Sequence, residues 1–443
     1  MILKEMPMLI NTRLEMVAIF LFIASGCAVQ KSVVSSNITP NFESASSVEE
    51  VRTQIKKLPS EDIWWNVYGE DQAWNFKNLH RFMPTVNVYR EGQVRMLKNR
   101  PIPAIPDQHV DTPIGAMSFK QFLDNKLSTT MSLVVLHQGD VVFEYYPNQK
   151  PYEKPIFWSA TKALVATLVG ILSDRGQIDI SLPISHYLPV LNNSDYSAIT
   201  VRNLLDMATG INCPEEYFDK KSCYYQYSIT VGDGYWDDSS PNSPYEMLAS
   251  LKPGIETPQG SLYQYTGVNA FLLSWLVEDI MEMPFQDAVT QEIWRKMGAE
   301  SDASFLAPRY GVPIAHGGLM ARSRDFARFG LLFTPSYKKI SDEQIISDQM
   351  IDRILNDINP NLTLEANKTG SLPPGFSHSG YLWDAVYTND DFYRGGWAGQ
   401  GLLINPTKDL VAVYTGYAID AQESQPKLLP ILRTVLNNVF PIR

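Results

Sequence analysis

The sequence predicts an α+β fold: an antiparallel sheet built from both ends of the chain and flanked by helices, with a helical subdomain. Strand patterns occur over residues 131–146 and again over 393–417. Strongly apolar helical patterns fill the middle of the chain, and an amphipathic one closes it. Since the strands enclose a helix-rich region, we expect the two ends to share one sheet.

Turn and periodicity signals justify the elements in order. Gln138, Gly139 and Asp140 join two apolar runs into a β-hairpin, and a turn at 405–409 joins two C-terminal strands. Helices are predicted over Ser159–Asp174, 201–210, 269–281 and 427–440.

The composition limits the possible functions. Of 443 residues, 44% are hydrophobic and 19% charged, which supplies a sizeable core and excludes a disordered or fibrous chain. The formal net charge of -11 argues against a nucleic-acid partner, because binding phosphates needs a basic face. The sequence contains no CxxC pair, Cys/His cluster, Walker loop or dinucleotide glycine fingerprint, so we expect neither a metal nor a cofactor.

The N-terminus carries the pattern of an export signal. The apolar run Met16–Ala24 follows Lys4 and Arg13 and is too short to span a membrane. The small residues before Cys27 resemble a bacterial lipobox, whose cysteine is acylated and becomes the mature N-terminus. This resemblance implies a signal peptide over 1–27, a lipid anchor at Cys27, and a place on the periplasmic side of the bacterial cell envelope. An ordinary secretory peptide is the alternative.

Three segments follow the signal. Residues 28–59, rich in Ser, Asn and Val, are typical of a tether. Residues 60–115 place Trp64 and Trp65 among polar residues, ahead of a proline-rich stretch, which indicates an aromatic extension packing on the core. Residues 116–443 hold the predicted sheet and helices as one domain.

Two cysteines lie close together in the middle of the chain. In an oxidising compartment Cys213 and Cys223 can close a short loop through a disulfide. Two free buried thiols are the equal alternative.

A Ser-x-x-Lys pattern is the strongest chemical signal. It occurs at Ser159/Lys162, Ser336/Lys339 and Ser424/Lys427. Only the first begins a long buried helix, because the second lies in a polar turn and Pro426 interrupts the third.

Residues three apart share one helical face, so the Lys162 amine can reach the Ser159 hydroxyl. A serine hydroxyl needs a neighbouring base to become a nucleophile, and apolar surroundings disfavour the ammonium form of a lysine. A helix-capping serine with a solvated lysine is the structural alternative.

The surrounding sequence resembles a known superfamily. FWSATKALVATLVGILSDRGQIDISLPISHYLP, followed by VRNLLDMATGI, is similar to the nucleophile segment of serine β-lactamases and penicillin-binding-protein-like enzymes. This resemblance implies a β-lactamase-like fold and hydrolysis of an ester or amide through an acyl-enzyme on Ser159. The implied substrate is a small molecule or a short peptide-like compound.

The superfamily's second landmark, Tyr-x-Asn, corresponds to Tyr265 in PQGSLYQYTGVNAFLLSWLVE, where Gly267 stands in place of the asparagine. Tyr263 is the rival tyrosine, but it fits the aromatic lead-in of the motif better. The resemblance makes Tyr265 a proton carrier for Ser159. Beside a lysine ammonium we expect it to be favoured as a phenolate.

The third landmark is Lys or His, then Thr or Ser, then Gly. Lys368-Thr369-Gly370 spells it, but two prolines follow at once, whereas Arg394-Gly395-Gly396-Trp397 leads into the expected strands. We prefer the second, which implies an oxyanion hole of the Ser159 and Trp397 amides and substrate binding by Arg394, Gly395 and Gly396. Without side chains at Gly267 and Gly395, efficient β-lactam recognition is not expected.

The closer likeness is to the esterase and nylon-oligomer hydrolase branch, whose GxxGQ signature appears as Gly396, Gly399 and Gln400. Two alternatives stay open: a peptidoglycan D-alanyl carboxypeptidase or weak β-lactamase, and a catalytically degenerate binding or sensor protein. We interpret His316 as a structural turn residue, and His378 approaches the site only if its loop folds over it.

Overall fold

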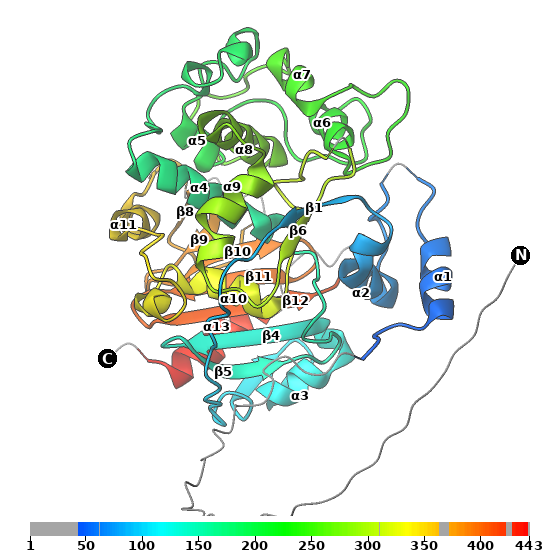
Figure 1. The fold of residues 1–443 in the computed structure, drawn as a ribbon, viewed down its shortest axis with the longest axis vertical. Helices are drawn as coiled ribbons and strands as arrows, with labels where there is room; N and C mark the ends of the chain where they lie inside the picture. The colour runs from blue at the N-terminus through cyan, green and yellow to red at the C-terminus, as the bar shows by residue number, and fades with distance from the viewer. Residues whose placement is uncertain (1–42, 62, 310, 363–371, 422–427, 442–443) are drawn as a thin grey trace, which may run out of the picture. The chain divides into compact units, whose positions relative to one another are not determined.

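A seven-stranded antiparallel sheet organises the part of the chain that the computed structural model describes, residues 43–441 without 62, 310, 363–371 and 422–427. The strand order is β5-β4-β12-β11-β10-β9-β8. The strands are β4 (Thr130–His137), β5 (Asp140–Tyr145), β8 (His378–Gly380), β9 (Trp383–Val386), β10 (Phe392–Gly396), β11 (Gln400–Asn405) and β12 (Leu410–Gly416). Because β4 pairs with β12, the predicted sharing of one sheet by both ends is confirmed (Figure 1).

Side chains alternate between two apolar layers, as the period of a strand requires. In β4, Val134 and Leu136 join one core, whereas Leu133 and Val135 join the other. The first core lies against α4 (Lys162–Asp174), α8 (Gly267–Met281) and α10 (Ser323–Leu331). The second lies against α3 (Phe119–Asp124) and α13 (Leu428–Val439).

The remaining helices and the two small sheets complete the fold, and several of them also bury residues in the first core. The helices are α1 (Val48–Lys56), α2 (Gly69–Asn78), α5 (Val201–Leu205), α6 (Cys223–Val231), α7 (Pro244–Ala249), α9 (Phe285–Glu292) and α11 (Asp348–Asn356). The two small sheets contain β1 (Thr85–Val88), β6 (Ala303–Leu306) and β7 (Leu319–Met320), and β2 (His109–Thr112) with β3 (Gly115–Ser118). Within the described residues, the helices all fall short of the length and apolar character that crossing a bilayer demands.

Two predictions differ clearly from the observed elements beyond shifts of one or two residues at helix ends, apart from the start of α4, which is described with the active site. The helix expected over 201–210 ends at Leu205, because Met207 adopts a left-handed backbone with φ 53°. The C-terminal region has three strands instead of two, since Gly399, at φ 92°, lets the chain reverse between β10 and β11. The hairpin of β4 and β5 and the turn between β11 and β12 are confirmed.

Candidate active site

Ser159 lies just before the buried helix α4. It belongs to a 3₁₀ turn, η3 (Trp158–Thr161), and α4 begins only at Lys162. The expectation that Ser159 begins the α-helix is therefore wrong. The spacing still brings the two side chains together, because residues three apart eclipse in a 3₁₀ turn. Trp158, with φ 44°, holds the sharp entry into this turn.

Three predicted side chains meet at the Ser159 hydroxyl. The Lys162 Nζ lies 3.0 Å from Ser159 Oγ, and the Tyr265 hydroxyl lies 2.7 Å from the same oxygen. Tyr265 reaches it from the segment that enters α8, and the Lys162 Nζ lies 4.9 Å from the centre of its ring. Either neighbour is within proton-transfer distance of the serine.

Burial determines the protonation states of Lys162 and Tyr265. Lys162 is fully buried, which, together with the nearby Arg394 cation, lowers its pKa to about 7. Burial raises the pKa of the Tyr265 phenol, and Arg394 offsets this only in part. The expected phenolate is therefore wrong, because desolvation outweighs the effect of the Arg394 cation on the Tyr265 pKa. Near neutral pH the site can hold a neutral amine and a protonated phenol.

Arg394 braces the site from β10. Its side chain is buried, and its Nε donates to the Ser159 carbonyl and its Nη2 to the Tyr265 hydroxyl, both at 2.9 Å. Its Nη1 forms an ion pair with Asp384, whose other carboxylate oxygen accepts from the Gly395 amide at 2.8 Å. Gly395 and Gly396 line the site's cavity, whereas Arg394 is not among the lining residues.

The close approach of β10 to η3 depends on Gly396. A Cβ at this position would lie 2.2 Å from the Phe157 carbonyl oxygen, so no larger residue fits. Trp397 follows at the strand end, and both Trp397 and Ser159 line the cavity, as the predicted oxyanion hole requires. Gln400 holds this turn through its amide nitrogen, which donates to the carbonyls of Trp397 and Gly416.

The Ser159 hydroxyl faces a cavity of about 460 Å³. One wall is aromatic: the Trp65 ring contacts those of Trp397 and Tyr217 with centroids 4.9 and 4.8 Å apart. The charged side chains that line the cavity are acidic. The described lining residues include the carboxylates of Glu215, Asp233 and Asp384 and no Lys or Arg. Of these residues, sequence reasoning assigned only Trp397 to the site. The pair Trp64 and Trp65 in a polar segment was the only other signal for the wall.

The histidines take different places. His316 lines the cavity, and its carbonyl accepts from the Lys162 amine at 2.8 Å. We expected only a structural role for His316 in a turn, but it also contacts Lys162. His378 is buried in β8, where its Nε2 lies 3.0 Å from the Ile354 carbonyl oxygen, and it is not among the described lining residues.

The rival motifs do not form a second site among the described residues. Ser336 bonds to Asp409, and the Lys339 amine bonds to Gln138 and Asp140. Ser424, Lys427, Lys368-Thr369-Gly370 and the predicted lipidation residue Cys27 lie outside the described residues.

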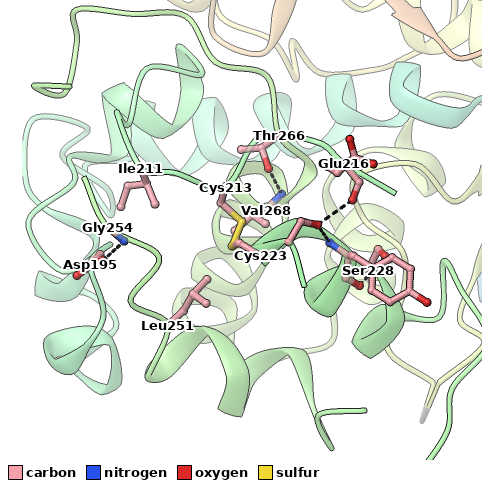
Figure 2. Close-up of a disulfide and its surroundings, with 12 residues drawn as sticks. Asp195, Ile211, Cys213, Glu216, Cys223, Ser228, Leu251, Gly254, Thr266 and Val268 are labelled. Atoms are coloured by element: carbon pink, nitrogen blue, oxygen red, sulfur yellow. Dashed lines mark hydrogen bonds between the residues drawn. A yellow bond between two sulfur atoms is a disulfide. The ribbon is translucent and has the colours of Figure 1, made fainter. Parts of the chain in front are cut away.

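A disulfide joins Cys213 and Cys223, with Cα atoms 5.2 Å apart, which decides between the two alternatives left open by the sequence. Figure 2 shows it beside Thr266 and Val268, at the start of α8. The bond fixes the loop that carries Glu215 and Tyr217 to the first residue of α6.

Known proteins resemble this chain in sequence. The family model described as Beta-lactamase matches residues 118–416. A 6-aminohexanoate-dimer hydrolase from Paenarthrobacter ureafaciens is 26% identical over 358 residues, covering 80% of this chain and 87% of that protein.

Solved structures share the fold. A Bacillus anthracis protein named as a 6-aminohexanoate-dimer hydrolase has a TM-score of 0.71 and 20% identity, covering 87% of this chain and 96% of its own. EstCE1, a hydrolase with promiscuous acyltransferase activity, has a TM-score of 0.56 and 14% identity, covering 72% of this chain and 96% of its own. The likeness establishes a β-lactamase-like fold.

Proposed function

Because this chain belongs to the β-lactamase family and is thus a serine hydrolase, we propose that it cleaves uncharged esters or amides through an acyl-enzyme on Ser159. The observation that carries this proposal is the convergence of Lys162 and Tyr265 on one hydroxyl, at 3.0 and 2.7 Å. A degenerate sensor has no need to keep three such groups in contact.

The proposed reaction has two halves. The neutral Lys162 amine takes the Ser159 proton as Oγ forms a bond to the carbonyl carbon, and the backbone amides of Ser159 and Trp397 bind the oxyanion. The bond to the leaving group then breaks, and Tyr265 passes a proton to the departing oxygen or nitrogen, regaining one from Lys162. A water molecule cleaves the acyl-enzyme by the same steps and restores Ser159.

The cavity favours an uncharged, partly apolar substrate. Trp65, Trp397 and Tyr217 offer an apolar wall, whereas Glu215 and Asp233 repel an anion. A β-lactam or a D-alanyl peptide carries a carboxylate, and Arg394 is already bonded to protein groups. The peptidoglycan and β-lactam alternatives are therefore disfavoured.

The site can serve amides as well as esters. An amine leaves only after it gains a proton, and burial keeps the Tyr265 phenol protonated beside Ser159. A 6-aminohexanoate dimer with both ends blocked, so that it carries no charge, is the first amide to test, given the relative from Paenarthrobacter ureafaciens.

The test is the intact mass after treatment with a fluorophosphonate, together with turnover of a short-chain aryl ester and of a chromogenic cephalosporin. We expect one adduct on Ser159, ester cleavage, and no cephalosporin turnover. An adduct that survives Ser159→Ala, or an unreactive Ser159, refutes the proposal.

We also propose that Cys27 carries a lipid that holds the enzyme on the periplasmic side of the bacterial cell envelope. The lipobox-like sequence supports this. Metabolic labelling with an alkynyl fatty acid should mark the wild type and not Cys27→Ser. Equal labelling of both would contradict the proposal.

A further inference from the structure

Gly267 occupies the position of the asparagine in the Tyr-x-Asn motif. The space that an asparagine side chain would need is filled by other side chains. A Cβ on Gly267 would lie 2.6 Å from the Tyr224 hydroxyl and 2.8 Å from His316 Cδ2. Both distances are shorter than a Cβ atom tolerates. Glycine is therefore required here because Tyr224 and His316 occupy the place of a larger side chain.

His316 is in direct contact with the lysine of the site. The Lys162 amine donates to the His316 carbonyl at 2.8 Å and lies 3.0 Å from Ser159 Oγ. Lys162 is fully buried, so no solvent molecule from outside competes for this arrangement. The place of the His316 backbone thus decides where the amine sits relative to the serine.

Both ring nitrogens of His316 are held. Nδ1 lies 3.0 Å from the Tyr227 hydroxyl, and Nε2 lies 2.9 Å from Asp233 Oδ2. His316 and Asp233 are each 3% exposed. Hydrogen bonds at both nitrogens hold the ring in one orientation and thereby restrain the backbone that carries it.

The partners of the ring belong to one anchored segment, α6 and the two residues after it. The disulfide fixes the start of α6. At its end, the indole of Trp64 donates to the Gly232 carbonyl at 2.9 Å, and that of Trp65 donates to the Asp233 carbonyl at 2.8 Å. The aromatic extension therefore holds Asp233 in place for its bond with the histidine.

We propose that the Asp233–His316 pair, with Tyr227, positions Lys162 for proton transfer from Ser159. The inference rests on the proposed function, since it assigns no substrate of its own and serves the base of that reaction. His316 and Asp233 are positioning residues: they act on the serine only through Lys162.

The pair also contributes to the charge around Lys162. The charged groups facing the amine are Arg394 on β10, Asp384 on β9, and Glu215 and Asp233 on either side of α6. Arg394 lowers the pKa of Lys162, and the three carboxylates raise it. Removing the charge of Asp233 therefore lowers this pKa further, and the amine loses its proton at a more acid pH.

The test measures the rate of fluorophosphonate reaction at Ser159 against pH, which needs no knowledge of the natural substrate. We expect Asp233→Asn to react about tenfold more slowly at its plateau and to show an acid limb shifted to lower pH. His316→Gln should slow the reaction by a similar factor. Tyr227→Phe, which removes only one hydroxyl, should slow it less.

Two matched variants control for the loss of a buried polar group. His378→Gln alters a histidine as buried as His316, and Asp391→Asn alters a buried carboxylate paired with Arg433. Both should react like the wild type. If Asp233→Asn does not fold, as judged by circular dichroism, His316→Gln and Tyr227→Phe decide the matter.

An unchanged rate and acid limb in folded Asp233→Asn or His316→Gln would overturn the positioning role, while the wild type still reacts at Ser159. A wild type that does not react at Ser159 would instead overturn the proposed function itself. The two failures are thus distinguishable.

Discussion

The floor and the wall of the cavity are built in different ways. The floor consists of Ser159 and Tyr265, which line the cavity, and of Lys162, which is buried behind them. Two neighbouring elements, the η3–α4 junction and the start of α8, bring these three residues together. The wall holds Trp65, which reaches across a separation of 168 residues to bond with the Asp233 carbonyl. The difference teaches that the contact between Ser159 and Lys162 depends on local spacing, whereas the position of Tyr265, 106 residues away, and the shape of the cavity depend on long-range packing.

Changes in the floor should cause the largest losses. Lys162→Met removes the base, and Ser159→Ala removes the nucleophile. For each variant we expect turnover of an aryl ester to fall by about 1,000-fold or more. Steady-state kinetics at pH 8 measures both. Ser336→Ala, from the rival Ser-x-x-Lys pair, should leave turnover unchanged, and a comparable loss in that variant would break the assignment.

Tyr265→Phe should act mainly on the leaving group. We expect a loss of about 100-fold on an amide and a smaller loss on an activated aryl ester, because an aryl oxide departs without a proton. The measurement compares kcat/KM for both substrates. The control is Tyr263→Phe, which removes a buried hydroxyl without a described hydrogen-bond partner. Equal losses on ester and amide would contradict a proton-donor role.

A change in the wall should alter binding and leave the chemistry intact. Tyr68→Ala removes aromatic surface that lines the cavity beside Trp397, so we expect KM for an aryl ester with a long acyl chain to rise about tenfold, with kcat within about twofold. Trp74→Ala serves as the control, since Trp74 lies in the same extension but is not among the described lining residues. A fall in kcat without a change in KM would show that wall and floor are not separate.

The disulfide should matter least to catalysis and most to stability. Replacing both Cys213 and Cys223 with serine frees a loop of sequence separation 10, which should lower the free energy of unfolding by about 2–3 kcal/mol. Urea denaturation under non-reducing conditions measures this, and adding reductant to the wild type should reproduce the loss. An unchanged midpoint in both would contradict it.

The floor could be predicted from the sequence because its residues lie in short motifs whose spacing survives small errors. Ser159 was predicted to begin the α-helix but lies in the 3₁₀ turn before it. The 3₁₀ turn brings its side chain to Lys162 equally well. The protonation of Tyr265 could not be predicted, since burial depends on residues distant in the sequence.

The wall left almost no sequence signal. Trp65 and Asp233 are neighbours only because the aromatic extension folds over the end of α6. Glu215 and Asp233 lie outside every motif that the sequence analysis identified. The role of His316 was missed because its contact with Lys162 goes through a backbone carbonyl, which any residue type provides.

The pH dependence of kcat/KM for an aryl ester tests most directly whether Lys162 is the base that activates Ser159. The amine accepts a proton from the serine only when neutral, so a pKa of about 7 predicts that kcat/KM rises with pH and reaches half its plateau near pH 7. Turnover that stays constant down to pH 5, or that rises only near pH 10, would contradict the account.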